Sequence, residues 1–375
     1  MVDVADLLAE LIEIDSTNPS LVPGAPGEGA LVRALARRAT AAGLSVDCWE
    51  LLPGRPNLVA TLAGSGGGPS LMFVGHTDVV GAAPEGYRAE RRGARMYGRG
   101  SNDMKAGLAA AMVAIERLAA GPRLRGDVIF AGVIDEEWLS IGAEDLVART
   151  KPDAAILPES SGHDVITGHG GFAWYSVESR GVEAAGVEQE RGVDGIALLG
   201  PVLSGIAALD RELAAKPAGP YGRGSIHAST ISGGDQLPVY PALCSLGVER
   251  CLIGGESVAH ADAEIEGLLA ATRAADPRFA GEWRRIVGRE PVELDPAHPM
   301  VAALTQAASA ALGRPATVRG DLGWMDSGIL VEAGVPCSSF GPVGGGEHTA
   351  DEWVDLPSVD LTVDVLEATA RIFCA

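Results

Sequence analysis

The sequence is poor in basic residues, and this shortage limits its partners. It has 29 Lys and Arg against 50 Asp and Glu, which gives a formal net charge of −21 over 375 residues. Binding to phosphate backbones or to anionic lipid headgroups needs basic surface. The composition therefore predicts that neither nucleic acid nor a membrane is a partner. It leaves room for cationic small molecules and for carboxylates that hold metal.

Long hydrophobic runs and paired cysteines are also missing. The longest apolar stretch, 196–209, is interrupted by Gly200 and Pro201 and is shorter than the ~20 residues of a membrane-spanning helix. The N-terminal segment is acidic and lacks the basic start and small-residue cleavage site of a signal peptide. The five cysteines are scattered and include no CxxC pair, so we expect free thiols rather than a disulfide framework or thiolate metal site. These features predict a cytoplasmic protein.

What is present is enough apolar sequence for a large core, since 47% of the residues are hydrophobic. Amphipathic helical patterns alternate with short apolar strands from residue 3 to residue 157. The run LMFV at 71–74 is apolar throughout, as expected of a strand that is covered on both faces. This alternation predicts an α/β core in which a mixed central sheet is flanked by helices.

The pattern changes near residue 172. An alternating strand at 172–179 precedes a long helix at 192–214, two strands at 225–231 and 244–250, and a helix at 257–274. Such a β-α-β-β-α block is typical of a small α+β unit. Helix and strand alternate again after about residue 290. We therefore expect a discontinuous core domain, residues 1–175 and 288–375, interrupted by an inserted α+β domain, residues 176–287.

Residues able to ligate metal are concentrated in five short segments that follow strands or glycine turns. These are GHTDVV (75–80), GRGSNDMKAG (98–107), IDEEW (134–138), LPES (157–160) and GGGEHTADEW (344–353). Open α/β sheets place their sites at the carboxyl ends of strands. Histidines and carboxylates without thiolate suit Zn, Co or Mn at a catalytic centre with an open coordination position.

Within these segments the spacing of the side chains has chemical meaning. His76 and Asp78 point to the same side of an extended chain, and a carboxylate there can hold the second ring nitrogen of a ligating histidine. Asp103 opens a helix, where it could bridge two cations or serve only as a cap. Glu136 and Glu137 are neighbours that point in opposite directions, so one can bind metal while the other acts as a base. Each segment alone also fits a surface turn or an acidic loop, but their combination favours a metal centre.

The segments HTDVV, GRGSNDMKAG, DEE and EHTADEW, in this order, resemble the dinuclear zinc amidohydrolases and peptidases, the family of acetylornithine deacetylase, succinyl-diaminopimelate desuccinylase, aminoacylase and glutamate carboxypeptidase. The resemblance covers nearly the whole chain. It implies a zinc-peptidase-like core with a lid domain that dimerises, hence a homodimer. It also implies hydrolysis of the amide bond of an N-acyl amino acid or a short peptide. The expected cofactors are two divalent metal ions, Zn²⁺ first, with Co²⁺ or Mn²⁺ as alternatives.

The resemblance also assigns roles by position. For the core domain it implies that His76 and Glu159 bind the first metal, Glu137 and His348 bind the second, Asp103 bridges both, Asp78 orients His76, and Glu136 is the general base toward a metal-bridged water. For the inserted domain it implies that Arg250 clamps a substrate carboxylate and that Gln236, where the family often has Asn, contacts substrate.

One expected group is missing. The family's lid carries a stretch like G-x-x-A-H-G whose histidine stabilises the oxyanion, but this chain has Ala185 at that position, within SRGVEAAG (179–186). Losing one oxyanion donor costs about 10²–10³ in rate. Three interpretations stay open. Another group such as His227 substitutes, or the chain is a catalytically silent protein that binds metal or an amino-acid derivative, or the sequence carries a His→Ala change that inactivates an enzyme.

Overall fold

The chain forms two compact units. The computed structural model describes residues 3–219 and 221–375. Unit 1 contains the chain up to Thr167 together with Leu294–Arg319 and Met325–Ala375, and unit 2 contains Gly168–Glu293 and Gly320–Trp324. The expected cuts at 175/176 and 287/288 fall inside two strands, β9 (Gly171–Arg180) and β14 (Ala280–Arg289). Both strands belong to unit 2 because they hydrogen-bond to each other along their length.

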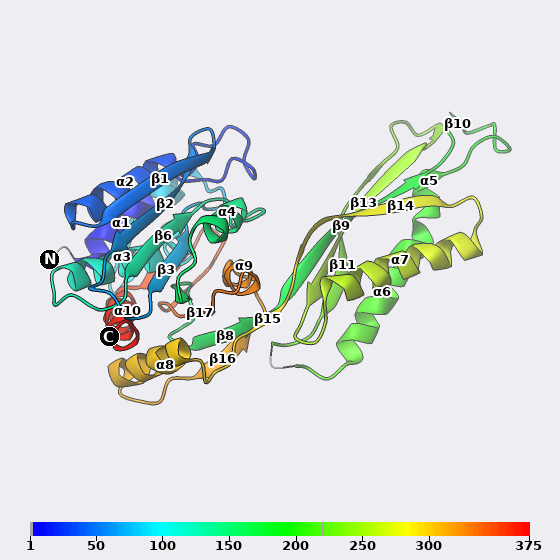
Figure 1. Ribbon diagram of the computed structural model, residues 1–375. Coiled ribbons are helices and arrows are strands. Elements are labelled where there is room, and N and C mark those ends of the chain that lie inside the picture. Colours follow the sequence, from blue (N-terminus) through cyan, green and yellow to red (C-terminus); the bar gives the residue numbers. More distant parts are fainter. Residues whose placement is uncertain (1–2, 220) are drawn as a thin grey trace. The chain divides into compact units, whose positions relative to one another are not determined.

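A mixed sheet runs through the described part of unit 1 (Figure 1). Three of its neighbouring pairs are parallel, β6–β3, β3–β7 and β7–β17, while β1–β2, β2–β6, β17–β8 and β8–β15 are antiparallel. The strands in spatial order are β1 (Ser45–Leu52), β2 (Arg55–Leu62), β6 (Val128–Val133), β3 (Leu71–His76), β7 (Ala154–Leu157), β17 (Cys337–Ser339), β8 (Val165–His169) and β15 (Val292–Glu293), with β16 (Val318–Asp321) also paired to β8. The predicted mixed α/β core is confirmed.

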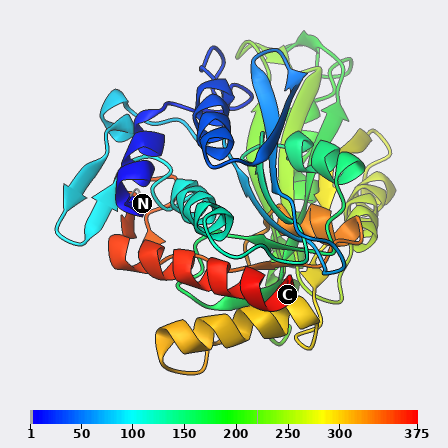
Figure 2. The same cartoon turned by 60° about the vertical axis from the view of Figure 1, so that its left-hand side comes forward.

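Helices cover both faces of this sheet (Figures 1 and 2). One layer holds α1 (Val4–Glu13), α2 (Gly29–Ala41), α3 (Lys105–Ala119), α8 (Pro299–Leu312) and α10 (Leu356–Phe373), and the other holds α4 (Ile141–Arg149) and α9 (Ser327–Glu332). Helix α3 lies between the sheet and α10, so 12 of its 15 residues are buried. This position explains why its sequence is alanine-rich and almost wholly apolar rather than amphipathic.

The central strand β3 positions the candidate site. All six of its residues are buried, and it lies between the parallel strands β6 and β7. Parallel neighbours end at the same edge of a sheet, so the turns that follow β3, β6 and β7 lie close together. These turns carry three of the five segments singled out in the sequence, the ones that contain Asp78, Glu137 and Glu159.

A small second sheet of unit 1 brings in the other two segments. It contains β4 (Glu90–Arg92), β5 (Arg95–Tyr97), β18 (Gly344–Gly345) and β19 (Trp353–Asp355), and the short 3₁₀ helix Pro84–Tyr87 precedes it. Strand β5 pairs antiparallel with β19, so the loop after β5 lies against the loop before β19. The first loop carries Asp103 and the second carries His348.

Unit 2 is an α+β unit in which helices cover one face of an antiparallel sheet. The sheet order is β11 (Ser225–Gly233), β13 (Leu243–Leu252), β9 and β14. Helices α6 (Gly200–Ala215) and α7 (Val258–Ala275) form the other layer, and α5 (Gly195–Leu198) and the pair β10 (Ala184–Ala185) and β12 (Val239–Tyr240) complete the described elements. No helix of the described residues is both long enough and apolar enough to span a bilayer.

Two expectations for unit 2 are corrected. The long helix at 192–214 is two helices, because the Asp194 side chain caps α5 at Ile196 and Ala197 and Pro201 starts a new first turn in α6. Strand β14 was not expected, because it is an edge strand whose residues are half-buried or exposed. It therefore lacks the alternation of apolar residues that predicts a strand.

The packing of α3 against the loop before Glu159 gives a testable prediction. A Cβ atom on Gly107 would lie 1.9 Å from the carbonyl oxygen of Pro158, whereas a Cβ atom on Gly267 of α7 meets nothing within 4 Å. We predict that Gly107→Ala lowers the free energy of unfolding by about 1–3 kcal/mol through overpacking. Gly267→Ala should raise it by up to about 1 kcal/mol through helix propensity. Urea unfolding of both variants checks the prediction, and a Gly107→Ala protein as stable as wild type contradicts it.

Candidate metal centre

The two histidines and three carboxylates expected to bind metal converge on one place in unit 1. His76 is the last residue of β3, Glu137 lies in the turn after β6, and Glu159 lies two residues after β7. Asp103 comes two residues before α3, and His348 lies between β18 and β19. The fold thus brings together residues that are far apart along the chain. His76 and His348 are separated by 272 positions.

The five side chains form two groups that share Asp103. In the first group the Nε2 atom of His76 lies 2.9 Å from Asp103 Oδ1 and 3.2 Å from Glu159 Oε1. In the second group the Nε2 atom of His348 lies 2.9 Å from Asp103 Oδ2 and 3.0 Å from Glu137 Oε2. The two oxygens of one carboxylate therefore face two different histidines.

This donor set fits a pair of divalent cations. Within each group the possible ligand atoms all lie within 4.8 Å of one another. Each group offers one imidazole and two carboxylates, which is the three-ligand N/O set that leaves a coordination position open. The side chain of His76 is buried, whereas that of His348 is 54% exposed. The second group therefore faces solvent more than the first.

The charge of the two groups shifts the pKa values of their members. Burial raises the pKa of Glu159 to about 7 and also raises that of Glu137. Hydrogen bonds to Asp103 and Glu137 raise the pKa of His348 to about 10. Burial alone would raise the pKa of Asp103, but its hydrogen bonds to His348 and His76 outweigh that effect and lower it. A cluster of half-buried carboxylates favours cations, either protons or metal ions.

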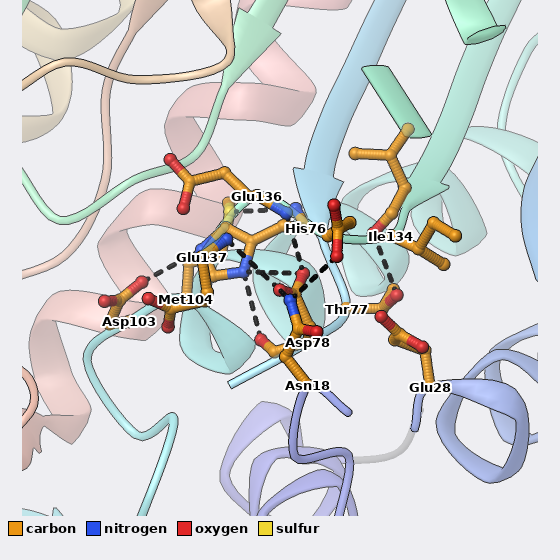
Figure 3. A network of polar contacts seen from close by, with 12 residues as sticks. Asn18, Glu28, His76, Thr77, Asp78, Asp103, Met104, Ile134, Glu136 and Glu137 are labelled. Carbon is orange, nitrogen blue, oxygen red and sulfur yellow. Dashed lines mark hydrogen bonds and ion pairs between the residues drawn. The ribbon is translucent and has the colours of Figure 1, made fainter. Parts of the chain in front are cut away.

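Asp78 lies beneath these groups, but it does not orient His76 in the expected way. The Nδ1 atom of His76 donates to the main-chain oxygen of Asp78 at 3.0 Å, while the Asp78 carboxylate is 3.7 Å away. That carboxylate instead accepts the main-chain N–H groups of Glu136 and Glu137, each at 3.1 Å (Figure 3). Because a carbonyl only accepts, Nδ1 carries the proton and Nε2 is left to bind a cation.

Glu136 belongs to neither ligand group. Burial raises the pKa of its carboxyl group well above the usual range, although the neighbouring His76 acts in the opposite direction, and nearby Asp326 and Glu137 raise it further. Glu136 is thus a carboxylate beside the ligand groups but outside them, and its pKa is raised. These are the properties of a general base.

Glu352 fixes the loop that carries Asp103. Its carboxylate accepts the main-chain N–H groups of Gly100, Asn102 and Asp103 at 2.9–3.0 Å, and it forms a buried ion pair with Arg99. Sequence reasoning assigned Glu352 no role, although it lies in the segment EHTADEW. Asn18, Glu28, Arg55 and Asp135 were missed in the same way: the first three lie outside the five segments, and Asp135 lies in IDEEW but was given no role.

Arg250, expected to clamp a substrate carboxylate, forms ion pairs within unit 2 in this structure. Its side chain is fully buried in unit 2, where Nε donates to Glu264 at 2.8 Å and Nη2 donates to Glu256 at 2.9 Å. Freeing this guanidinium would leave two carboxylates unpaired, at a cost of several kcal/mol by the usual measure of about 3–5 for breaking a buried pair. Its role toward a substrate carboxylate stays a prediction.

The other two positions singled out in the inserted domain lie on its surface. Gln236 is exposed and lines a pocket of about 330 Å³ together with Glu183 and Asp235. Ala185 is exposed in β10 and pairs with Val239 of β12. His227, the suggested substitute for the missing histidine, lies on β11 with its side chain 3.5 Å from Glu249.

The geometry of unit 1 defines a class, the hydrolases with two metal ions at the end of a mixed α/β sheet, and comparison with known proteins gives the family. The model of peptidase family M20/M25/M40 matches residues 72–372. The chain belongs to this family. It is therefore a metal-dependent amidohydrolase.

Curated relatives and solved structures agree with this assignment. The chain is 27% identical over 357 residues to N-formyl-4-amino-5-aminomethyl-2-methylpyrimidine deformylase of Bacillus subtilis, covering 86% of this chain and 83% of the relative. It is 25% identical to acetylornithine deacetylase of Proteus mirabilis, covering 98% and 96%. The M20 family metallo-carboxypeptidase Sso-CP2 of Sulfolobus solfataricus has a TM-score of 0.81 at 15% identity, covering 100% and 99%. A dinuclear metal binding peptidase of the M20 family from Bacillus subtilis has a TM-score of 0.71 at 15% identity, covering 99% and 97%.

The raised pKa values predict how metal binding depends on pH. Glu159, with a pKa of about 7, and His348, with a pKa of about 10, must both lose a proton before they can bind a cation. We therefore expect the apparent Zn²⁺ affinity of chelator-stripped protein to rise from about pH 6 toward about pH 10, with protons released on binding. Calorimetry in two buffers of different protonation enthalpy counts these protons. Affinity that does not change with pH contradicts the prediction.

Proposed function

We propose that this protein hydrolyses the amide bond of an N-acyl amino acid or a short peptide at a pair of divalent metal ions. The observation that carries the proposal is the pair of ligand groups that share the two oxygens of Asp103, with Glu136 beside them and outside both groups. The deformylase and deacetylase activities named for two relatives support an N-acyl substrate. Short peptides are the second candidate substrate class, because a metallo-carboxypeptidase and an aminopeptidase share the fold.

In this proposal each residue has a separate task. His76 and Glu159 hold one ion, Glu137 and His348 hold the other, and Asp103 contacts both. The ions, when bound, acidify water and polarise an amide carbonyl. Glu136 takes the proton of the attacking water and gives it to the amine nitrogen as the C–N bond breaks. Burial raises the pKa of its carboxyl group, which favours its taking up a proton.

We infer that the native metal is zinc, with cobalt or manganese as substitutes. Each group combines one imidazole nitrogen with two carboxylate oxygens and contains no thiolate. Zinc accepts such a mixed N/O set with an open position. Metal analysis of protein purified without chelator tests this inference.

We also infer a homodimer that forms through unit 2, in the cytoplasm. Strand β11 is an edge strand that pairs only with β13 in its sheet, and seven of its nine residues are exposed. An exposed edge with open backbone groups is a template for pairing with a second chain. The five cysteines are free thiols, which suits a reducing compartment. Sedimentation analysis tests the oligomeric state.

The role proposed for Glu136 predicts a separation of binding from turnover. Glu136→Gln removes the base but changes no ligand of either group, so zinc affinity should stay near that of wild type. The turnover number should fall about 10²–10⁴-fold, the usual range for a general acid–base group. Hydrolysis of N-acetyl, N-succinyl and dipeptide substrates by metal-loaded protein measures the loss. Glu10→Gln, on the exposed surface of α1, is the matched control. Wild-type turnover by Glu136→Gln, with contaminating enzyme excluded, removes Glu136 from the mechanism.

The missing histidine gives a second prediction. If Ala185 marks a lost oxyanion donor, Ala185→His should raise the turnover number by up to about 10²–10³-fold. Val187→His places the same side chain at a position that is 88% exposed in the same loop and serves as the control. Zinc binding without hydrolysis in both wild type and Ala185→His favours a catalytically silent binding protein. Full turnover of wild type that is lost in His227→Ala assigns the donor to His227 instead.

A further inference from the structure

A buried polar network lies next to the two ligand groups. It joins the turn after α1, the start of α2, the start of β2 and the turn after β6. Its members, called here the Arg55 network, are Asn18, Ser20, Glu28, Arg55, Asp78 and Asp135. Ser20 is exposed, and the other five are buried. Only Asp78 had been considered for the site, so the function of the other five is open.

Arg55 is the hub of this network. Its Nε atom donates to Glu28 at 2.8 Å, and its Nη1 atom donates to the hydroxyl group of Ser20 at 3.0 Å. Its Nη2 atom donates to Asn18 Oδ1 at 3.1 Å and to Asp135 Oδ1 at 2.9 Å. The side chain is 6% exposed. One planar guanidinium thus holds three separate segments of the chain.

These contacts fix the orientation of the Asn18 side chain. Its Nδ2 atom donates to Asp78 Oδ2 at 2.8 Å and to Asp135 Oδ1 at 3.1 Å (Figure 3). An ionised carboxylate only accepts hydrogen bonds, so the amide nitrogen must face these two residues. The amide oxygen then has to face donors, which are Arg55 and the main-chain N–H of Ser20 at 2.8 Å. Without Arg55, the oxygen of Asn18 loses its charged donor.

Asp135 connects the network to the turn that carries Glu136 and Glu137. Its φ angle is 72°, a left-handed conformation that non-glycine residues adopt rarely and at a cost. Its Oδ1 atom accepts hydrogen bonds from Asn18, Ser20 and Arg55. This conformation directs the chain so that the next two amide groups meet the Asp78 carboxylate. A residue keeps such a strained conformation only where several contacts with its surroundings hold it there.

Charge makes Arg55 hard to replace. Within the network it is the one cation among three buried carboxylates, those of Glu28, Asp78 and Asp135. Lysine would keep the charge but offers a compact ammonium group instead of a planar fork with five N–H donors. It cannot reproduce donors aimed at four residues at once.

We propose that Arg55 is a positioning residue of the metal centre. It orients Asn18 and Asp135, and through them it sets the Asp78 carboxylate and the turn of Glu136 and Glu137. Arg55 touches neither metal ligand group, so it acts only through these residues. The proposal rests on the proposed function for its kinetic readout, but its metal-binding readout stands alone.

The test compares Arg55→Lys with Arg38→Lys. Arg38 forms a bidentate ion pair with Glu116 between α2 and α3, outside the network, so the same chemical change there is a matched control. We expect Arg55→Lys to weaken zinc binding about 10–100-fold, the usual cost of losing a partner that orients metal ligands. In zinc-saturated protein it should lower the turnover number with little change in KM. Arg38→Lys should change neither quantity.

A purely structural role predicts a different result. In that case Arg55→Lys would lower the unfolding temperature but leave zinc affinity and turnover per folded molecule at the wild-type values, which overturns the proposal. If Arg55→Lys does not fold, Ser20→Ala replaces it, because Ser20 is exposed and its loss removes bonds to both Arg55 and Asp135. A smaller loss of zinc affinity in Ser20→Ala supports the proposal, and no loss overturns it.

The two proposals fail in distinguishable ways. If wild type binds zinc but hydrolyses none of the amides, the proposed function fails while the zinc titration still decides the role of Arg55. If wild type hydrolyses amides and Arg55→Lys matches it in zinc affinity and turnover, the proposed function stands and Arg55 is not a positioning residue. A wild-type chain that binds no zinc overturns both.

Discussion

Mutual repulsion of half-buried carboxylates is the constraint on which the rest of this structure depends. Asp103, Glu136, Glu137 and Glu159 raise one another's pKa values or have them raised by burial, and only Asp103 is held ionised by two histidines. Like charges this close are stable away from water only when cations lie between them. One oxygen of the Asp103 carboxylate faces His76 and the other faces His348. Compensating cations therefore have two positions, one on each side of Asp103.

The fold meets this constraint with two different sheets. The parallel strands β3, β6 and β7 end at one edge and supply His76, Glu137 and Glu159. The antiparallel pair of β5 and β19 supplies Asp103 and His348, which are 245 residues apart along the chain. Main-chain N–H groups stabilise the two carboxylates that hold the loops. Glu352 accepts three such hydrogen bonds and Asp78 accepts two. Strand ends and backbone donors together position the ligand groups.

The ligand candidates were expected because their segments together resemble the motifs of one family, and the structure brings their side chains together. Four of them follow strands or glycine turns: His76, Asp103, Glu137 and Glu159. Their imidazole and carboxylate side chains are of the types that bind divalent metals. Asn18, Arg55 and Asp135 carry no such signal, since their roles arise from contacts 80 and 117 residues away. The resemblance assigned Arg250 a role by position alone, and no local signal predicted its ion pairs with Glu256 and Glu264. The strand β14 was missed because half-exposed edge strands have no clear apolar period.

The departures from the family pattern all fall in unit 2. Arg250 is buried in an ion pair, Ala185 stands where a histidine is expected, and Gln236 stands where asparagine is common. In unit 1 the five residues that the resemblance implies as metal ligands are all present, and they form the two groups that share Asp103. The metal chemistry of this chain therefore follows from family membership, whereas its substrate has to be found from its own inserted unit.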